Sequence, residues 1–417
     1  MPGIRLSIPS LFSEIGRNRA NDQRREFVVE KRPSVGFPAR KVRAGVQLPA
    51  ESAGALTLNC RRLEWRAVML YDRVADLPLS VEEVALDMRE RETTSGFTRT
   101  TTVVSLRGNG ETGRGEDVTY DTAEHERFAS SAGSRSLRGE ATLDEFSDRL
   151  AEINFFPDAA PSQPIFRNYR RWAFESAALD LALKQADTNL AARLDRSYDP
   201  VRFVVSTRLA EPPTGEVVLD WLDRNPDLEF KLDPTAAWTD AVVERLAATD
   251  AVRILDLKGQ YHGTSVDQPA DPKLYERVID GFPTALIEDP DLTDATRPLF
   301  DGAEDRVTWD YPIRGVKSVA DLPWEPQWLN VKPSRFGSVE SLLATIEYCQ
   351  ERGIRLYGGG QFELDVGREH LHAFASLFYP TAPNDVAPRV YNDPDPGTVL
   401  PTSPLDPPAD PRGLSWS

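Results

Sequence analysis

The feature that most constrains this chain is a regular alternation of short apolar segments with amphipathic ones, which begins near residue 228. The apolar segments predict strands at 228–232, 252–257, 285–287, 307–309, 328–331 and 354–357. Repeated strand–helix units predict parallel strands joined by right-handed crossovers, and this many units favour a closed (β/α) barrel. A doubly wound sheet is the alternative, but it would normally carry a Gly-rich phosphate turn after its first strand, which this sequence lacks.

Helix start and stop signals stand between the predicted strands. Thr239 is a candidate N-cap, and Asp271 followed by Pro272 is a typical N-cap with proline at the first helical position. The clearest helix runs over 338–352, and Gly353 follows it where many helices end. These signals predict the crossover helices that a barrel requires.

The chain before residue 165 has a different pattern. Apolar and polar residues alternate over 58–120, and Gly108-Asn109-Gly110 interrupts them with residues that tolerate the positive φ angles of a hairpin turn. Helical periodicity follows at 141–155 and 172–190. We therefore predict a small antiparallel sheet with helices, an α+β domain that ends near residue 165.

Composition at the two ends of the chain sets the outer boundaries. The first 50 residues hold ten Arg/Lys and four Asp/Glu without an apolar run, which indicates an exposed extension rather than a signal peptide. Ten of the last 38 residues are proline, so we expect extended chain there, packed over the α+β domain. The predicted parts are an extension over 1–56, an α+β domain over 57–165, a barrel over 166–392 and a Pro-rich tail over 393–417.

Charge and cysteine content exclude several classes of protein. The 49 basic and 66 acidic residues give a net charge of −17, which opposes attraction to nucleic acid or anionic lipid. No apolar run approaches the ~20 residues that a membrane span needs. Cys60 and Cys349 have no metal-binding spacing around them and form no disulfide framework, which is typical of a cytoplasmic protein.

Five distinctive residues are expected at the C-terminal ends of successive barrel strands, where barrel enzymes carry their active sites. They are Lys231, Asp256, Glu288, Asp310 and Lys332, separated by 25, 32, 22 and 22 residues. Taken singly, an acid after a strand is usually a helix cap or a turn residue. The chain has eight lysines against 41 arginines, so their joint position at strand ends indicates function. Three carboxylates without histidine or thiolate suit Mg²⁺ or Mn²⁺ rather than zinc.

Several motifs accompany these residues. They are Gly-Arg-Gly-Glu-Asp-Val-Thr-Tyr at 113–120, Phe-Glu-Ser-Ala-Ala-Leu-Asp at 174–180, Ile-Glu-Asp-Pro at 287–290, Asn-Val-Lys-Pro-Ser-Arg-Phe-Gly at 330–337 and Gly-Gly-Gly-Gln-Phe-Glu-Leu-Asp-Val-Gly-Arg at 358–368. With them the sequence resembles the enolase superfamily, in the branch of mandelate racemases, muconate cycloisomerases and o-succinylbenzoate synthases, over roughly residues 90–392. The resemblance implies an N-terminal α+β capping domain and a TIM-like (β/α) barrel.

The resemblance also implies a chemistry. Asp256, Glu288 and Asp310 would bind Mg²⁺, and Lys332 and Lys231 would stand on opposite faces of the substrate. Such an enzyme removes the α-proton of a small carboxylate substrate through an enediolate intermediate, which a divalent ion stabilises. The implied activities are those of a racemase or epimerase, a cycloisomerase or a dehydrating lyase.

Two positions depart from the pattern of the resembled family. Its second strand usually carries Lys-x-Lys, whereas this chain has Lys231 followed two residues later by Asp233, so Lys231 could correspond to either lysine. Spacing favours the catalytic position and local context favours the other. The His–Asp pair of mandelate racemases and acid-sugar dehydratases is absent, because Lys332 and glycines stand in its place.

The third strand contains a further departure. The family usually has Asp-x-Asn there, and Lys258 replaces the asparagine. In an extended strand Lys258 would point to the same face as Asp256. We expect its ammonium group to lie one layer outside the carboxylates, where it would supply the charge of the missing second-strand lysine. The alternative is an ion pair with Asp256 or Glu288 that competes with Mg²⁺.

Smaller signals remain near the end of the barrel. Glu363 and Asp365 resemble the acidic pair with which dipeptide epimerases hold an α-ammonium group, and a strand-end salt bridge is the alternative. His370 and His372 are two residues apart on an expected helix, so they cannot share a face or form a metal pair.

The sequence thus predicts a cytoplasmic Mg²⁺-dependent isomerase or lyase with a small carboxylate substrate and a homo-oligomeric assembly as one option. Its candidate catalytic residues are Lys332, Lys231 and Lys258, and its candidate substrate-binding residues are Glu363 and Asp365. The alternative is a non-catalytic enolase-like barrel that binds a small molecule or serves a structural role. That alternative is motivated by the lysine and the asparagine that this chain lacks.

Overall fold

The structure is a computed structural model that describes residues 69–94, 96–130, 137–264, 266–397 and 399–416. The predicted extension over 1–56 and the first residues of the predicted α+β domain lie outside the described residues. The described residues all belong to one compact unit.

A three-stranded antiparallel sheet dominates the N-terminal part. Its strands are β2 (Glu83–Glu92), β3 (Thr98–Gly108) and β4 (Glu111–Asp117), in that order. The predicted hairpin turn is confirmed, because Asn109 and Gly110 join β3 to β4 with φ angles of 51° and 78°. A small second sheet pairs β1 (Pro78–Val81) with β5 (Gly139–Thr142), also antiparallel.

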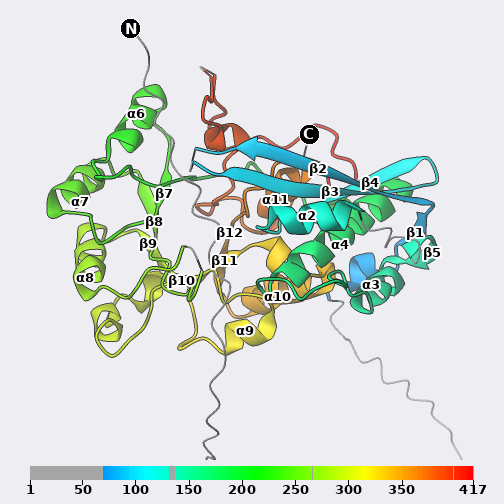
Figure 1. The fold of residues 1–417 in the computed structure, drawn as a ribbon, viewed down its shortest axis with the longest axis horizontal. Coiled ribbons are helices and arrows are strands. Elements are labelled where there is room, and N and C mark those ends of the chain that lie inside the picture. Colours follow the sequence, from blue (N-terminus) through cyan, green and yellow to red (C-terminus); the bar gives the residue numbers. More distant parts are fainter. Residues whose placement is uncertain (1–68, 95, 131–136, 265, 398, 417) are drawn as a thin grey trace, which may run out of the picture. The chain divides into compact units, whose positions relative to one another are not determined.

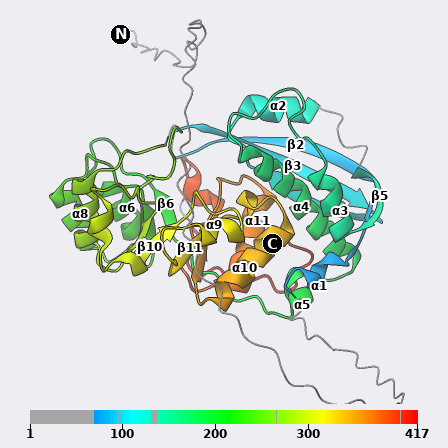
Figure 2. The ribbon, with the colours of Figure 1, turned by 90° about the horizontal axis from the view of Figure 1, so that it is seen from below.

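Helix α4 (Phe166–Gln185) lies directly against β4. Figure 2 shows α4 on one face of the antiparallel sheet. Two glycines of β4 permit this close approach. A Cβ atom on Gly113 would lie 2.2 Å from the backbone oxygen of Ala177, and one on Gly115 would lie 2.1 Å from that of Ala173. The glycines in the motif at 113–120 are therefore explained by helix–sheet packing. The other helices here are α1 (Asp72–Ala75), α2 (Thr122–Ser130), α3 (Leu143–Ala151) and α5 (Leu190–Leu194).

The C-terminal part is a curled sheet of seven parallel strands (Figure 1). In sheet order they are β6 (Val205–Thr207), β7 (Phe230–Leu232), β8 (Val252–Asp256), β9 (Leu286–Glu288), β10 (Val307–Trp309), β11 (Trp328–Val331) and β12 (Arg355–Gly358). All six predicted strands are present, whereas β6 was not predicted. Most residues of these strands are buried, as expected for a parallel sheet covered on both faces.

The two edges of the parallel sheet meet at a short segment. Asn384 bridges to Phe203, just before β6, and Asp385 bridges to Gly359, just after β12, both in parallel. The Asn384 side chain accepts a hydrogen bond from the Gly358 amide at 2.7 Å and donates to the Arg202 carbonyl at 2.9 Å. This segment takes the place of an eighth strand, so the fold is a TIM-like barrel with an N-terminal α+β capping domain.

Helices connect the strands on the outside of the barrel. They are α6 (Glu216–Arg224), α7 (Asp240–Ala247), α8 (Pro272–Gly281), α9 (Val316–Ala320), α10 (Val339–Glu351) and α11 (Val366–Phe378), with 3₁₀ turns η2 (Arg297–Phe300), η3 (Glu304–Arg306), η4 (Pro333–Arg335) and η5 (Arg389–Asn392). The predicted caps at Thr239 and Asp271 are confirmed, and the helix predicted to begin at residue 338 begins at Val339 with Ser338 as its N-cap. Thr239, Asp271 and Ser338 accept backbone N–H groups at the starts of α7, α8 and α10, and Gly353 has a φ of 68° after α10.

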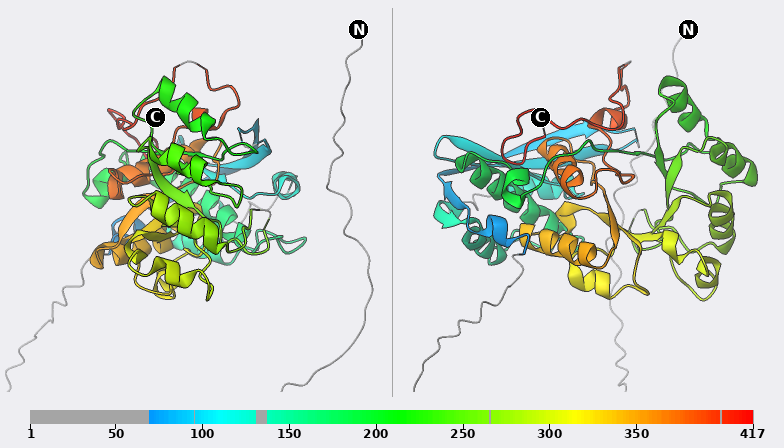
Figure 3. Two further views of the ribbon diagram at one scale, coloured as in Figure 1. Left: turned by 90° about the vertical axis from the view of Figure 1, so that its left-hand side faces the viewer. Right: turned by 180° about the vertical axis from the view of Figure 1, so that it is seen from behind.

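The proline-rich tail touches more of the molecule than predicted. Arg412 pairs with Glu111 of β4 at 2.8 Å, and the Leu414 amide donates to Asp180 of α4 at 2.9 Å, as expected for packing on the α+β domain. Leu405, however, pairs with Val201 at the entrance to the barrel. Figure 3 shows the tail in red. No helix in the described residues is both long enough and apolar enough to span a membrane.

His370 and His372 lie on α11 and are buried. Among the described residues, neither ring nitrogen of His370 has a hydrogen-bond partner, and the His372 Nε2 atom lies 2.7 Å from the Val386 carbonyl. Burial lowers the pKa of each histidine from 6.5 to about 4. The unfolded chain therefore binds protons that the folded chain excludes.

We expect these histidines to destabilise the protein as the pH falls from about 6.5 to about 4. The lost stability reaches about 3 kcal/mol for each histidine at the lower pH, since the folded pKa is the depressed one. Chemical unfolding at several pH values measures this slope. His370→Phe should remove its share, and His262→Gln, at an exposed loop position, should leave the slope unchanged. A slope unaffected by His370→Phe contradicts the prediction.

Candidate active site

Three carboxylates meet at the C-terminal end of the barrel strands. Asp256 and Glu288 are the last residues of β8 and β9 and are partners in the parallel register, and Asp310 directly follows β10. Each offers an oxygen atom, and these atoms lie within 4.8 Å of one another. All three side chains are buried. The structure thus brings together the three acids that the sequence placed at successive strand ends.

Lys231 lies among these carboxylates. It is in the middle of β7, and its Nζ atom contacts Glu288, lies 3.1 Å from Asp256 and lies 3.3 Å from Asp385. The side chain is only 1% exposed. Burial alone would lower the pKa of Lys231, but Glu288, Asp256 and Asp385 outweigh it and hold that pKa well above its ordinary value. Lys231 is therefore an enclosed positive charge.

Lys258 corrects an expectation. We expected its ammonium group one layer outside the carboxylates, but the Nζ atom contacts Asp256 directly and lies 3.6 Å from Asp233. The strand ends at Asp256, and Lys258 has a φ of 55°. This left-handed turn changes the direction of the chain, so the alternation of an extended strand does not apply. Burial alone would lower the pKa of Lys258. The carboxylates of Asp233 and Asp256 outweigh burial, so the pKa of Lys258 lies above its ordinary value.

A second group of cations faces Asp310. The Lys332 Nζ atom, directly after β11, lies 2.9 Å from Asp310, and Arg335 of η4 lies 3.1 Å from it. Tyr261 donates a hydrogen bond to the same carboxylate at 2.9 Å. Burial would raise the pKa of Asp310, but Arg335 and Lys332 outweigh it and hold that pKa below its ordinary range.

Glu288 is held by neutral donors as well. The Tyr357 hydroxyl donates to it, and the Asn330 amide donates at 3.2 Å. Burial raises the pKa of Glu288 well above its ordinary value, with Lys231 acting in the opposite direction. The neighbouring Asp289 accepts the amides of Asp310 and Tyr311, each at 2.8 Å, and so fixes the backbone that carries Asp310.

Five residues that contact the site were not assigned roles from sequence: Asn330, Arg335, Tyr357, Tyr261 and Asp385. The first two stand in the motif at 330–337, which was a usable signal. The other three lie in the last strand, the loop after β8 and the segment that closes the barrel. Only the tertiary structure brings them to the carboxylates.

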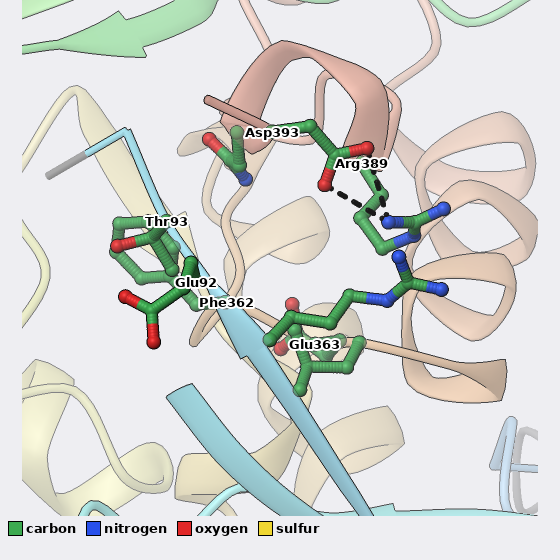
Figure 4. Close-up of a pocket in the computed structure, with 9 residues that line it drawn as sticks. Glu92, Thr93, Phe362, Glu363, Arg389 and Asp393 are labelled. Atoms are coloured by element: carbon green, nitrogen blue, oxygen red, sulfur yellow. Dashed lines mark hydrogen bonds and ion pairs between the residues drawn. The ribbon is translucent and has the colours of Figure 1, made fainter. Parts of the chain in front are cut away.

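Glu363 and Asp365 are separated by their contacts. Asp365 caps α11 and pairs with Arg89 of β2 at 2.7 Å. Glu363 is buried and lines a cavity of about 10 Å³ between the end of β2, residues 362–364 and residues 389–393 (Figure 4). Glu363 also pairs with Arg368 at 3.5 Å, so both residues have the salt-bridge contacts that were the alternative. A substrate-binding role for Glu363 and Asp365 stays a prediction.

A larger cavity of about 370 Å³ lies elsewhere and is lined by Trp309, Leu292, Leu322 and residues of the neighbouring loops. None of the three carboxylates lines it. The candidate active site is therefore the carboxylate cluster.

The donor set fits a hard divalent cation. Mg²⁺ prefers oxygen ligands, and three buried carboxylates from three strands supply them without nitrogen or sulfur. In the described part of the chain this is the one group of three or more acidic, histidine or cysteine side chains close enough to share an ion.

Comparisons with known proteins agree with this architecture. The family described as Domain of unknown function (DUF8230) matches the chain in both its parts, with its N-terminal domain over residues 72–193 and its C-terminal domain over residues 197–393. An N-succinylamino acid racemase of Amycolatopsis is 28% identical over 237 residues, which cover 53% of this chain and 61% of the relative. An o-succinylbenzoate synthase of Geobacillus kaustophilus is 27% identical over 236 residues, 53% of this chain and 59% of the relative. The matches therefore span about three fifths of these curated relatives.

Solved structures show the same fold. A dipeptide epimerase from Methylococcus capsulatus, complexed with a Mg ion, superimposes with a TM-score of 0.60 at 17% identity, over 81% of this chain and 99% of that chain. The muconate lactonizing enzyme from Pseudomonas putida gives 0.57 at 19% identity, over 80% and 96%. A member of the enolase superfamily from Listeria innocua gives 0.59 at 19% identity, over 76% and 87%.

Proposed function

The chain belongs to the family described as Domain of unknown function (DUF8230) and has the fold of solved enolase-superfamily proteins, and from this premise we propose that it is a Mg²⁺-dependent enolase-superfamily enzyme that removes the α-proton of a small carboxylate substrate. The observation that carries the proposal is the convergence of Asp256, Glu288 and Asp310 with Lys332 beside them. Three buried anions next to a scarce lysine are costly for stability alone, which supports a catalytic reason for them.

The chemistry assigned to each residue follows from its contacts. Asp256, Glu288 and Asp310 would hold the ion, which supplies positive charge where the substrate carboxylate becomes more negative as the α-proton leaves. Lys332 takes the α-proton, leaving an enediolate, and returns a proton or lets a β-substituent depart. The enclosure of Lys231 by three carboxylates supports a role as a fixed charge, and the greater exposure of Lys258, at 14%, supports a place nearer the substrate.

The curated relatives suggest the first substrates to test. One is named for racemising N-succinylamino acids and the other for making o-succinylbenzoate. N-succinyl-L-alanine in D₂O, with Mg²⁺ present, is the simplest probe because α-proton exchange reports proton removal before any later step. Exchange detected by NMR supports the proposal. Binding without exchange, across acyl-amino acids, dipeptides and cyclohexadienyl acids, contradicts it.

A prediction concerns Lys258. Its ammonium group contacts Asp256, so it opposes a divalent ion at the same carboxylate. We expect Lys258→Asn to tighten Mg²⁺ binding by about tenfold, since a unit charge is removed at contact distance. Calorimetry measures the affinity, and α-proton exchange should be retained. Lys317→Asn, which removes a surface lysine paired with Asp321, is the control and should change neither quantity. Unchanged Mg²⁺ affinity in Lys258→Asn contradicts the competition.

A non-catalytic binding role is the second candidate. The observation in its favour is that every carboxylate of the cluster already contacts a basic side chain: Asp256 contacts Lys231 and Lys258, Glu288 contacts Lys231, and Asp310 contacts Lys332 and Arg335. Such a balanced cluster could stay closed to a cation. Calorimetry that detects the probe acid but no Mg²⁺ binding favours this candidate.

The remaining expectations belong to the same proposal. A cytoplasmic location is supported by the scarcity of cysteine and by Cys349 being buried with a free thiol. The domain boundaries at residues 57, 166 and 393 and a homo-oligomeric assembly stay predictions. Size-exclusion chromatography with light scattering tests the assembly.

A further inference from the structure

The loop between β12 and α11, residues 359–365, is held by a carboxylate of the antiparallel sheet. Glu116 of β4 accepts hydrogen bonds from the amides of Leu364 at 2.7 Å, Asp365 at 3.1 Å and Gly367 at 2.8 Å. The side chain is 1% exposed. The carboxylate of Glu116 thus accepts hydrogen bonds from backbone N–H groups at the start of α11, which have no acceptor within the helix.

A buried cation of the same sheet holds the other half of this loop. Arg99 of β3 donates to the carbonyls of Gln361 at 3.1 Å and Phe362 at 3.4 Å, and also to those of Val118 and Thr119 in its own domain. It is 2% exposed. The loop has no strand or helix partner for these carbonyls, so the guanidinium group takes that place. The carboxylate of Glu116 binds the amide groups of this segment, and the guanidinium group of Arg99 binds its carbonyl groups. Together they fix the loop backbone.

The turn between β2 and β3 packs on the same loop. The Thr94 amide donates to the Asn392 carbonyl at 2.9 Å, and the rings of Phe97 and Phe362 meet edge to face with centroids 5.5 Å apart. Figure 4 shows Phe362 and Glu363 next to Glu92 and Thr93, with Arg389 bonded to Asp393. The cavity between residues 91–93 and residues 362–364 is only about 10 Å³, so these two segments are closely packed.

The first residue of the loop, Gly359, packs against the side chain of Lys332. A Cβ atom on Gly359 would lie 2.8 Å from the Cε atom of Lys332 and 2.5 Å from Oδ1 of Asn330. The backbone of Gly359 therefore forms a wall against the lysine stem. The Gly359 amide also donates to the Val331 carbonyl at 3.1 Å, so the loop leaves the barrel directly beside the stem of Lys332.

We propose that Glu116 and Arg99 are positioning residues for Lys332, acting through the loop that they hold; this inference rests on the proposed function for the base role of Lys332. The capping domain thereby fixes the proton-transfer lysine of the barrel without touching it. The Glu116–Arg99 clamp, as we call these two side chains, links the order of the loop to turnover.

Hydrogen exchange tests the clamp without any substrate. In Glu116→Gln the amide offers one acceptor oxygen in place of two, so we expect the amides of residues 358–370 to exchange about tenfold faster or more. Arg99→Met, which removes the donors to Gln361 and Phe362, should act on the same peptide. Asp180→Asn is the matched control, because Asp180 is also a buried carboxylate that accepts backbone amides, those of Arg114 and Leu414. It should leave residues 358–370 protected.

Activity tests the positioning role. With N-succinyl-L-alanine in D₂O we expect kcat for α-proton exchange to fall by about tenfold or more in Glu116→Gln, because displacement of a reacting group lowers the rate steeply. Mg²⁺ affinity should stay within about twofold, since the hydrogen bonds of Glu116 and Arg99 to the loop involve none of the three proposed metal ligands. Asp180→Asn should keep kcat.

Unchanged exchange of residues 358–370 in both clamp variants overturns the inference. So does an equal loss of protection or of kcat in Asp180→Asn, which would indicate general destabilisation. An unchanged kcat in a clamp variant whose loop has lost protection also overturns the positioning role. If the parent protein exchanges no α-proton of any probe, the proposed function fails by itself, and hydrogen exchange alone decides whether the clamp holds the loop.

Discussion

Lys332→Ala is expected to abolish α-proton exchange while leaving substrate binding intact. Removing a general base lowers the rate by about 10²–10⁴-fold, which brings exchange close to background. Lys332 is 7% exposed and its ammonium group lies 2.9 Å from Asp310, so it stands beside the proposed metal ligands. Exchange followed by NMR in D₂O and binding followed by calorimetry measure the two quantities.

Lys332→Arg tests whether the residue acts by accepting a proton or only by its positive charge. Arginine keeps the positive charge, but its guanidinium group stays protonated and cannot accept a proton, so this variant should be as inactive as Lys332→Ala. Lys273→Ala, at a position on α8 in the outer ring of helices, is the control and should retain full exchange. Substantial exchange in Lys332→Arg would show that another residue is the base.

Glu288→Gln is expected to weaken Mg²⁺ binding by about 100-fold or more, because changes in outer-shell partners alone cost 10–100-fold in metal affinity. The replacement keeps the volume of the side chain and its place among Asn330 and Tyr357 but removes one anionic ligand. Lys231 retains Asp256 and Asp385 as counter-charges, so the fold should persist. Titration of Mg²⁺ by calorimetry measures the change, and circular dichroism checks the fold.

Asp385→Asn is the matched control for that experiment. Asp385 also faces Lys231, at 3.3 Å, but it does not belong to the carboxylate cluster. Its replacement should leave Mg²⁺ affinity within about threefold, because the removed charge belongs to no proposed ligand. An equal loss in both variants would mean that Lys231, rather than the loss of a ligand, controls the site.

Local patterns were reliable wherever neighbouring residues alone set the conformation. Asn109 and Gly110 tolerate positive φ, so the hairpin could be located without a partner strand. Thr239 marked the start of α7 and Gly353 the end of α10, because capping is a contact within one turn of the helix. The three-residue strand β6 has no such pattern, because it gains its partner only by pairing with β7.

The site shows the same division. Each parallel strand starts and ends near its neighbours, so the ends of β8, β9 and β10 had to bring Asp256, Glu288 and Asp310 to one place once the barrel was predicted. The direction of Lys258 could not be predicted in this way. Its backbone leaves the strand one residue earlier, and a left-handed turn decides where its ammonium group lies.

The sequence by itself determined the order of strands and helices and the identity of the three carboxylates, because these depend on periodicity, capping and regular spacing. Only the tertiary structure decided which charges meet. Asp385 reaches Lys231 across the closure of the barrel, and Glu116 reaches the start of α11 from a strand about 250 residues earlier. Such contacts carry no local signal, since each acidic residue alone is ordinary, and they form only when segments far apart in the sequence have folded together.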